Sequence, residues 1–521
     1  MSLLRSAAVI SGFTLLSRIT GLARDILIAR AFGAGPLTDA FWVAFRIPNL
    51  LRRLFAEGAF SQAFVPILGN AKETRSPEEV RVLLDRIALV LLAVLMAITL
   101  AGILLAPWVV SAMASGLRTT GKEAGFDAAI WRTRAMFPYS ICMSLVALAS
   151  GVLNTWRRFA VPAFTPLLLN LSMIAAAIWL APHIDPPIYA LAIGVMVGGV
   201  AQLAVQWIAL ARIGLVPRLS LRLRQAWRDP TVTHILKQML PATIGVSVAQ
   251  VSLLINTNIA TWLTPGSVSW LSFADRLMEF PTALLGVALG TVLLPSLSRA
   301  HAQGDSDTYN DLLDRGLRLV LLLGLPAALG MALLSDGLVA TLFHYGAFDA
   351  SDVANTRVAV IAYAAGLIGM LSVKILAPGF YAKQDIRTPV KIAIGVLIAT
   401  QLFNLVLVPS LQHAGLALAI GLGACINALA LLIGLLRRGV YRPAQDWPRF
   451  FLRLLPALAA MSVPLLLAQQ HLDWIALQSQ PVLRAAWLAA TVAGSAALYF
   501  ALLLLCGFRP ADFGRGPKPK N

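Results

Sequence analysis

Charged side chains lie inside long apolar segments in three parts of this 521-residue chain. An arginine at mid-membrane costs about 2.5–3.5 kcal/mol even on the lenient insertion scale, so the helices that carry these residues are expected to line a wet cavity. The arginine side chain suits phosphate, because its guanidinium group is planar, can donate two parallel hydrogen bonds and is permanently charged. The pattern is consistent with a transported anion bearing phosphate groups, or with salt bridges inside a helix bundle. The residues concerned are Arg18, Arg24 and Asp25, then Asp39, Arg46, Arg52, Arg53 and Glu57, and finally Asp275, Arg276 and Glu279.

Helical spacing predicts which charged residues of the first segment share a helix face. Arg18 and Asp25 are seven positions apart and are expected to share one helix face over two turns. Arg24 is expected to project about a third of a turn away from that face.

Two further pairs have the spacing of intrahelical ion pairs. Arg53 and Glu57 lie at i,i+4, and Arg276 and Glu279 lie at i,i+3. Part of their charge is therefore expected to be neutralised within each helix.

The motifs that would indicate an enzyme are incomplete. The run GLRTTGKE (116–123) approaches a phosphate-binding loop but has Glu123 where Ser or Thr must hold magnesium. The six histidines are far apart, which gives no metal-ligand spacing, and the three cysteines all fall in apolar runs. We expect no catalytic residue, metal or cofactor.

Composition indicates a membrane protein built from helices. Hydrophobic residues make up 58% of the chain and charged residues only 13%, about half of the usual share. Apolar runs long enough to cross a bilayer predict an all-α polytopic protein with fourteen spans. The predicted spans are 7–32, 37–60, 87–113, 135–154, 162–181, 187–211, 238–262, 270–297, 317–343, 358–378, 390–408, 413–436, 450–470 and 484–506.

Basic residues alternate between the loops in a way that predicts orientation. With the N-terminus in the cytoplasm, 28 Lys and Arg fall in cytoplasmic segments and 7 on the opposite side. Both termini are therefore predicted to be cytoplasmic. The net charge of +18 is scattered between apolar segments, with no basic domain, so nucleic-acid binding is not expected.

Two pairs of segments indicate an internal repeat. AFVPILGNA (63–71) parallels VLLPSLSRA (292–300) at an offset of 229, and GVLNTWRRFAVP (151–162) parallels PGFYAKQDIRTP (378–389) at 227. Two six-helix lobes, 1–230 and 231–440, followed by two further helices and a basic tail in 441–521, fit these offsets. Repeats of this kind are common in transporters.

Two long stretches resemble one family. SRITGLARDILIARAFGAGPLTDAFWVAFRIPNLLRRLFAEGAFSQAFVPIL (17–68) and FADRLMEFPTALLGVALGTVLLPSLSRA (273–300) are similar to the signatures of the MurJ (MviN-type) lipid II flippase family. That family belongs to the multidrug/oligosaccharidyl-lipid/polysaccharide exporter superfamily. The resemblance implies export of lipid II, an undecaprenyl-pyrophosphate-linked disaccharide peptide, from the cytoplasmic to the periplasmic leaflet of the bacterial inner membrane.

The resemblance also implies roles for individual residues. Arg18, Arg24, Arg52 and Arg276, with Asp25, match family positions expected to bind substrate, and Asp39, Arg53, Glu57 and Glu279 are expected to form gates or support the cavity. The two additional helices imply a groove for the lipid tail. The expected partners are lipid II and membrane lipids, and the expected state is a monomer.

The driving force and two other functions stay open. Some members of the family bind sodium, but an acidic sodium site is not completed here by Asn256, Asn258 and Asp385. Transport is therefore expected to be driven by the membrane potential or by coupling to sodium or protons. An exporter of drugs or of another lipid-linked oligosaccharide would share the layout. A membrane glycosyl-polymerase would need carboxylates in a large extracytoplasmic loop, and the loop 114–134 offers only Glu123 and Asp127.

Overall fold

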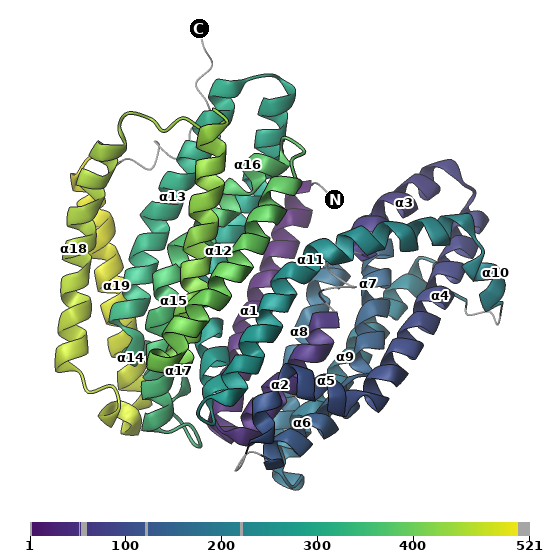
Figure 1. The fold of residues 1–521 in the computed structure, drawn as a ribbon, viewed down its shortest axis with the longest axis horizontal. Coiled ribbons are helices and arrows are strands. Elements are labelled where there is room, and N and C mark those ends of the chain that lie inside the picture. Colours follow the sequence, from purple (N-terminus) through teal and green to yellow (C-terminus); the bar gives the residue numbers. More distant parts are fainter. Residues whose placement is uncertain (1–2, 52, 54–59, 120–122, 219–221, 509–521) are drawn as a thin grey trace. The chain divides into compact units, whose positions relative to one another are not determined.

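The computed structural model describes residues 3–508 apart from 52, 54–59, 120–122 and 219–221, and all the regular structure among these residues is helical (Figure 1). The chain divides into two compact units, Met1–Ser269 and Trp270–Asn521. The first unit holds α1 (Leu3–Phe32), α2 (Pro36–Leu51), α3 (Phe60–Thr74), α4 (Pro77–Leu104), α5 (Ala106–Met113), α6 (Glu123–Met136), α7 (Tyr139–Thr155), α8 (Ala160–Ala175), α9 (Ala190–Arg212), α10 (Leu223–Trp227) and α11 (Pro230–Trp262). Helix α12 (Ser267–Ala302) begins at the boundary. It is followed by α13 (Ser306–Leu333), α14 (Ser335–Phe343), α15 (Ala350–Leu376), α16 (Pro378–Tyr381), α17 (Arg387–Arg437), α18 (Trp447–His471) and α19 (Pro481–Leu505).

Most of the predicted spans overlap helices of the structure, whereas α6 lies largely in the segment 114–134 that was expected to be a loop. In the described part of the chain, nine helices are long and apolar enough to cross a membrane. The fourteen spans predicted from the sequence stay a prediction, as does the division into lobes at 230 and 440. In the predicted second span, 37–60, α2 extends to Leu51 and α3 begins at Phe60, and residues 52 and 54–59 lie outside the described part of the chain.

Helix α17 covers two predicted spans and is bent where the loop between them was expected. Gln412 has φ 52° and ψ −131°, a conformation that side-chain-bearing residues rarely adopt. The helical hydrogen-bond ladder cannot continue through such a residue, so the segments before and after Gln412 are separate helices. The predicted boundary between 408 and 413 lies at this bend.

The internal repeat is visible in the ends of the helices. Helices α4 and α13 both have 28 residues, and their starts and ends lie 229 positions apart. Ser76 caps α4 by accepting from the Glu79 amide, and Asp305, at the same offset, caps α13 by accepting from the Thr308 amide. Both helices are followed, after one residue, by a short apolar helix, α5 or α14.

A second pair of turns repeats with the same backbone hydrogen bonds. Arg157 and Gln384, 227 positions apart, both have positive φ, 58° and 60°. The amide of the next residue then bonds back to Leu153 O at 2.7 Å in one turn and to Phe380 O at 3.1 Å in the other. This is the Schellman arrangement that ends a helix with a left-handed residue. The sequence similarity at this offset therefore reflects the same local structure.

Close packing between helices holds each unit together. In the first unit α8 packs against α1 and α9, and α2 packs against α6. In the second, α15 packs against α13 and α17, and a Cβ at Gly366 would lie 2.1 Å from Gly421 Cα, so only glycine permits this approach. Helices α18 and α19 lie side by side against α13 and α14 (Figure 1), and the Tyr499 hydroxyl donates to Leu322 O at 2.6 Å.

Candidate functional site

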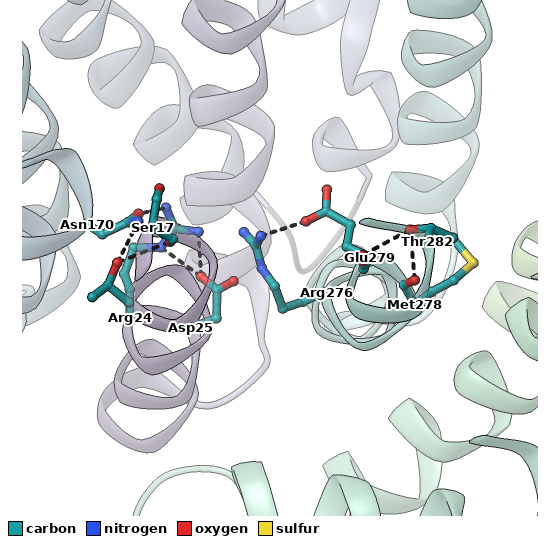
Figure 2. Close-up of polar contacts among 9 residues, drawn as sticks. Ser17, Arg24, Asp25, Asn170, Arg276, Met278, Glu279 and Thr282 are labelled. Carbon is teal, nitrogen blue, oxygen red and sulfur yellow. Dashed lines mark hydrogen bonds and ion pairs between the residues drawn. The ribbon is translucent and has the colours of Figure 1, made fainter. Parts of the chain in front are cut away.

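A buried polar cluster joins α1 to α8 in the first unit. Arg24 donates through Nε to Asp25 Oδ1 at 2.8 Å, and its Nη2 lies 2.7 Å from the same oxygen (Figure 2). Its Nη1 donates to Asn170 Oδ1 at 3.1 Å. The Asn170 amide in turn donates to Ser17 O at 2.9 Å and to Thr20 Oγ1 at 3.2 Å. The guanidinium is thus held from two helices and is only 5% exposed.

The contact between Arg24 and Asp25 differs from what their helical spacing predicts. The sequence placed Arg24 on a different face from Asp25, yet the two are joined. Consecutive helical residues point about 100° apart. The arginine side chain is long enough to reach across that angle in a buried setting, where leaving the Asp25 carboxylate uncompensated would be costly. Arg18, one of the other predicted substrate ligands, is half-buried on α1.

Asn170 is a residue of this candidate site that the sequence analysis did not identify. It is a neutral residue in the apolar run of α8 and therefore carried no charge signal. The available signal was the cost of burying a primary amide in an apolar helix without partners. Its contacts to Arg24, Ser17 and Thr20 make it a positioning residue for the guanidinium.

Replacing Asn170 with alanine is expected to lower the transport activity that depends on Arg24 by roughly tenfold, because one hydrogen bond to a charged group is lost. The measurement is transport or growth support at matched membrane abundance. Asn154→Ala, on an exposed part of α7, is the control and should behave as wild type. If Asn170→Ala were equally active, Asn170 would not position Arg24 for function.

Asp39 binds the beginning of α12. Its Oδ2 accepts from the Gly266 amide at 2.7 Å, and its Oδ1 accepts from the Ser269 amide at 2.8 Å and from the Ser269 hydroxyl at 2.6 Å. Asp39 and Ser269 are both buried. A carboxylate from α2 thus accepts hydrogen bonds from amides at the N-terminal, positive end of α12. An N-cap residue normally plays this part, but it immediately precedes the helix that it caps.

Arg276 and Glu279 form the ion pair that their spacing indicated. Arg276 Nη1 lies 2.7 Å from Glu279 Oε2 on α12, and the two side chains are 24% and 37% exposed (Figure 2). Lys374 on α15 donates to Thr282 O at 2.8 Å, within one turn of Glu279. Lys374 is a second residue near the predicted site whose contact the sequence did not indicate.

The remaining predicted residues are placed only in part. Arg53, two residues after the end of α2, is half-buried. Arg52 and Glu57 lie outside the described residues, so the predicted Arg53–Glu57 pair is not described. Asp385 accepts from the amide and the hydroxyl of Thr388 and pairs with Arg438. These hydrogen bonds, the largest effect coming from the Thr388 hydroxyl, lower the pKa of Asp385 to about 2.

Each of the two units holds a candidate arginine together with a counter-charge. Arg24 and Arg276 each contact a carboxylate on their own helix, which lowers the cost of holding an arginine in a protein interior. A polyanion with more charge and more acceptor oxygens than one carboxylate can compete for such guanidinium forks. Each arginine is thus suited to exchange its carboxylate partner for an anion without covalent chemistry.

Solved structures with this fold are membrane exporters. One chain described as the lipid II flippase MurJ in an inward closed conformation aligns with a TM-score of 0.78 at 22% identity, covering 95% of this chain and 100% of that one. An inward-facing multidrug resistance MATE family transporter of the MOP superfamily aligns with a TM-score of 0.64 at 15% identity, covering 83% and 98%. This chain shares the fold of these two proteins, and nine of its described helices are long and apolar enough to cross a membrane.

The sequence comparisons define the family. The family model described as "Lipid II flippase MurJ" matches residues 28–482. The lipid II flippase MurJ of Burkholderia cenocepacia is 54% identical over 518 residues, covering 99% of this chain and 100% of that protein. A probable lipid II flippase MurJ of Haemophilus influenzae is 39% identical over 513 residues, covering 95% and 98%. The chain belongs to the lipid II flippase MurJ family.

Proposed function

We propose that this protein is a lipid II flippase that moves the lipid-linked peptidoglycan precursor from the cytoplasmic to the periplasmic leaflet of the bacterial inner membrane. The observation that carries the proposal is the 54% identity to the Burkholderia cenocepacia flippase over essentially the whole of both chains. The head group, a pyrophosphate with two sugars and a peptide, cannot cross hydrocarbon unaided, because burying charged and unpaired polar groups costs many kcal/mol. The protein supplies a polar path and performs no covalent chemistry.

The pyrophosphate is the part of the substrate that the arginines recognise. In this proposal Arg18, Arg24, Arg52 and Arg276 donate to its oxygens, and Asp25 holds Arg24 when no substrate is bound. The contacts of Arg24 with Asp25 and Asn170 support this role, since they pre-form the guanidinium geometry. Asp39, Arg53, Glu57 and Glu279 support the cavity or form its gates, and the undecaprenyl tail lies along α18 and α19. The protein acts as a monomer in this scheme, with lipid II and membrane lipids as its partners.

Alternating access fits the contact made by Asp39. We infer that the hydrogen bonds from Gly266 and Ser269 to Asp39 close the periplasmic side, and that they break when the cationic cavity opens outward. Three hydrogen bonds that can be exchanged for water are a suitable reversible latch, because a hydrogen bond to a charged group has a net worth of only about 1.5–3 kcal/mol.

The membrane potential is the proposed driving force, with sodium or proton coupling as the alternative. An inside-negative potential favours outward movement of a net negative substrate by about 2.3 kcal/mol per charge per 100 mV. Dissipating the potential should therefore increase the fraction of molecules with the Asp39 latch closed, seen as a higher yield of crosslink between Asp39→Cys and Ser269→Cys. An unchanged yield on depolarisation would exclude potential-driven movement and favour an ion gradient.

The proposed orientation places both termini in the cytoplasm, on the asymmetry of basic residues. After replacement of Cys142, Cys425 and Cys506 by serine, single cysteines at Thr74 and Ser479 test it, because both positions are exposed. An impermeant maleimide added to intact cells with a permeabilised outer membrane should label Ser479→Cys and leave Thr74→Cys unlabelled. The reverse labelling would invert the topology.

Drug export is the second candidate, because the fold is shared with a multidrug transporter. The two functions are separated by a competition assay with the purified protein and fluorescent lipid II. Unlabelled lipid II and undecaprenyl pyrophosphate should displace the probe, whereas cationic drugs such as ethidium should not. Displacement by the drugs alone would make the protein a drug exporter and reject the flippase proposal.

A further inference from the structure

A second basic site lies within the second unit, at the end where α13 and α18 begin and α19 ends. A cavity of about 340 Å³ there is lined by Arg315 and Arg318 of α13 and by Arg449 and Arg453 of α18. None of these four arginines belongs to the proposed transport site.

Arg318 forms a fixed wall of this cavity. Its Nε donates to Asp314 Oδ2 at 2.7 Å, its Nη1 and Nη2 donate to the two oxygens of Asp446 at 2.9 and 2.5 Å, and its guanidinium lies over the Trp447 ring at 5.1 Å. The hydrogen bonds from Arg318 hold the pKa of Asp446 below its usual range, so this carboxylate stays ionised. Asp314 also accepts from the Tyr441 hydroxyl and the Trp447 indole, both at 2.7 Å. Two of the three carboxylates in the lining are thus committed to structural bonds.

The other charges of the lining favour an anion. Arg449 and Arg453 are one helical turn apart on α18 and therefore share a face, with Arg315 opposite on α13 and Asp311 as the third carboxylate. Arg449 is exposed and Arg453 half-buried, so both are accessible to a ligand. Arginine binds phosphate oxygens through two parallel hydrogen bonds, so two arginines on one helix face can both donate to one phosphodiester.

Apolar surface continues directly from the cavity. Phe450 and Phe508 line it, and on the adjoining surface Leu452 of α18 is 76% exposed and Leu505 of α19 is 82% exposed. Large apolar side chains exposed to this extent on a membrane helix face acyl chains. Trp447, at the first position of α18, is an aromatic residue of the kind that lies at head-group level.

We propose that this cavity binds the head group of an anionic phospholipid of the cytoplasmic leaflet, of the phosphatidylglycerol class, whose acyl chains lie against α18 and α19. Basic pockets between membrane helices are suited to such head groups. The bound lipid bridges α13 and α18 and so stabilises the attachment of the last two helices. The proposal depends on the proposed cytoplasmic orientation only for the choice of leaflet, and not on the substrate that is transported.

The test is lipid binding by the full-length protein, measured by native mass spectrometry after titration with phosphatidylglycerol. Arg449→Gln/Arg453→Gln should weaken the tightest-binding lipid by roughly 30-fold, the effect of removing two arginines near a membrane surface. Arg158→Gln/Arg212→Gln removes the same charge from exposed positions of the first unit and should leave binding unchanged. Phosphatidylglycerol should also raise the Tm of wild type and of this control, but not of the cavity variant.

Two results would overturn the proposal. Equal phosphatidylglycerol binding by the cavity variant and the control would show that the arginines do not form a lipid site. Glycerol 1-phosphate binding as tightly as the lipid would mean that the cavity takes a soluble phosphoester, with no part played by the acyl chains. Phosphatidylethanolamine, which has the same phosphodiester but no net charge, should bind weakly.

Discussion

Arg24→Ala is expected to abolish growth when this protein is the sole flippase in a depletion strain. Arg24 is buried and bonded to Asp25 and Asn170, so its loss removes a proposed pyrophosphate ligand and leaves the Asp25 carboxylate buried and uncompensated. Removing one partner of a buried ion pair costs about 3–5 kcal/mol. Arg24→Lys should also fail or nearly fail, because lysine keeps the charge but cannot contact Asp25 and Asn170 with a planar fork.

Folding and function are separated by a charge-neutral double variant. Arg24→Gln/Asp25→Asn leaves no unpaired charge, so it should reach wild-type abundance in the membrane and still not support growth. Arg30→Ala, at the exposed end of α1, is the matched control and should grow normally. Growth of the double variant at wild-type abundance would remove Arg24 from the substrate site.

A disulfide between Asp39→Cys and Ser269→Cys is expected to stop transport completely and reversibly. The Asp39 carboxylate and the Ser269 hydroxyl are 2.6 Å apart, so two cysteines at these positions are close enough to be joined under mild oxidation. If the latch must open in every cycle, the oxidised protein should be inactive, and a reductant should restore activity. Flipping is measured before and after reduction in a background without Cys142, Cys425 and Cys506.

A second cysteine pair shows whether crosslinking itself is harmful. Thr99 and Ser140 join α4 and α7 through hydroxyl oxygens 3.3 Å apart, inside the first unit and away from the proposed latch. The disulfide Thr99→Cys/Ser140→Cys should form without loss of transport. Full activity of the oxidised Asp39→Cys/Ser269→Cys protein would mean that this contact does not open during the cycle.

Local patterns predicted much of the fold. Hydropathy located most of the long helices, and the offset of 227 paired the two segments that hold the left-handed turns at Arg157 and Gln384. The caps at Ser76 and Asp305 lie at the other offset, 229. Such features depend on a few neighbouring residues. They are therefore readable from the sequence.

Contacts between distant segments could not be predicted in the same way. The partners of Asp39 lie about 230 positions away and are mostly backbone amides, which carry no sequence signal. Asn170, 146 positions from Arg24, is uncharged, and charge was the property used to find the site. Spacing gave the correct Arg276–Glu279 pair because both residues lie on one helix surface, but it missed Arg24–Asp25, where side-chain length outweighs angular position.

The leaflet in which lipid II accumulates is the most direct test of the proposed function. Cells in which this protein is the sole flippase are depleted of it, and lipid II is then exposed to a periplasmic enzyme that cleaves it only in the outer leaflet. We expect total lipid II to rise and its cleaved fraction to fall towards zero, with recovery on re-expression of wild type but not of Arg24→Gln/Asp25→Asn. An undiminished cleaved fraction after depletion would show that lipid II crosses without this protein and would contradict the assignment.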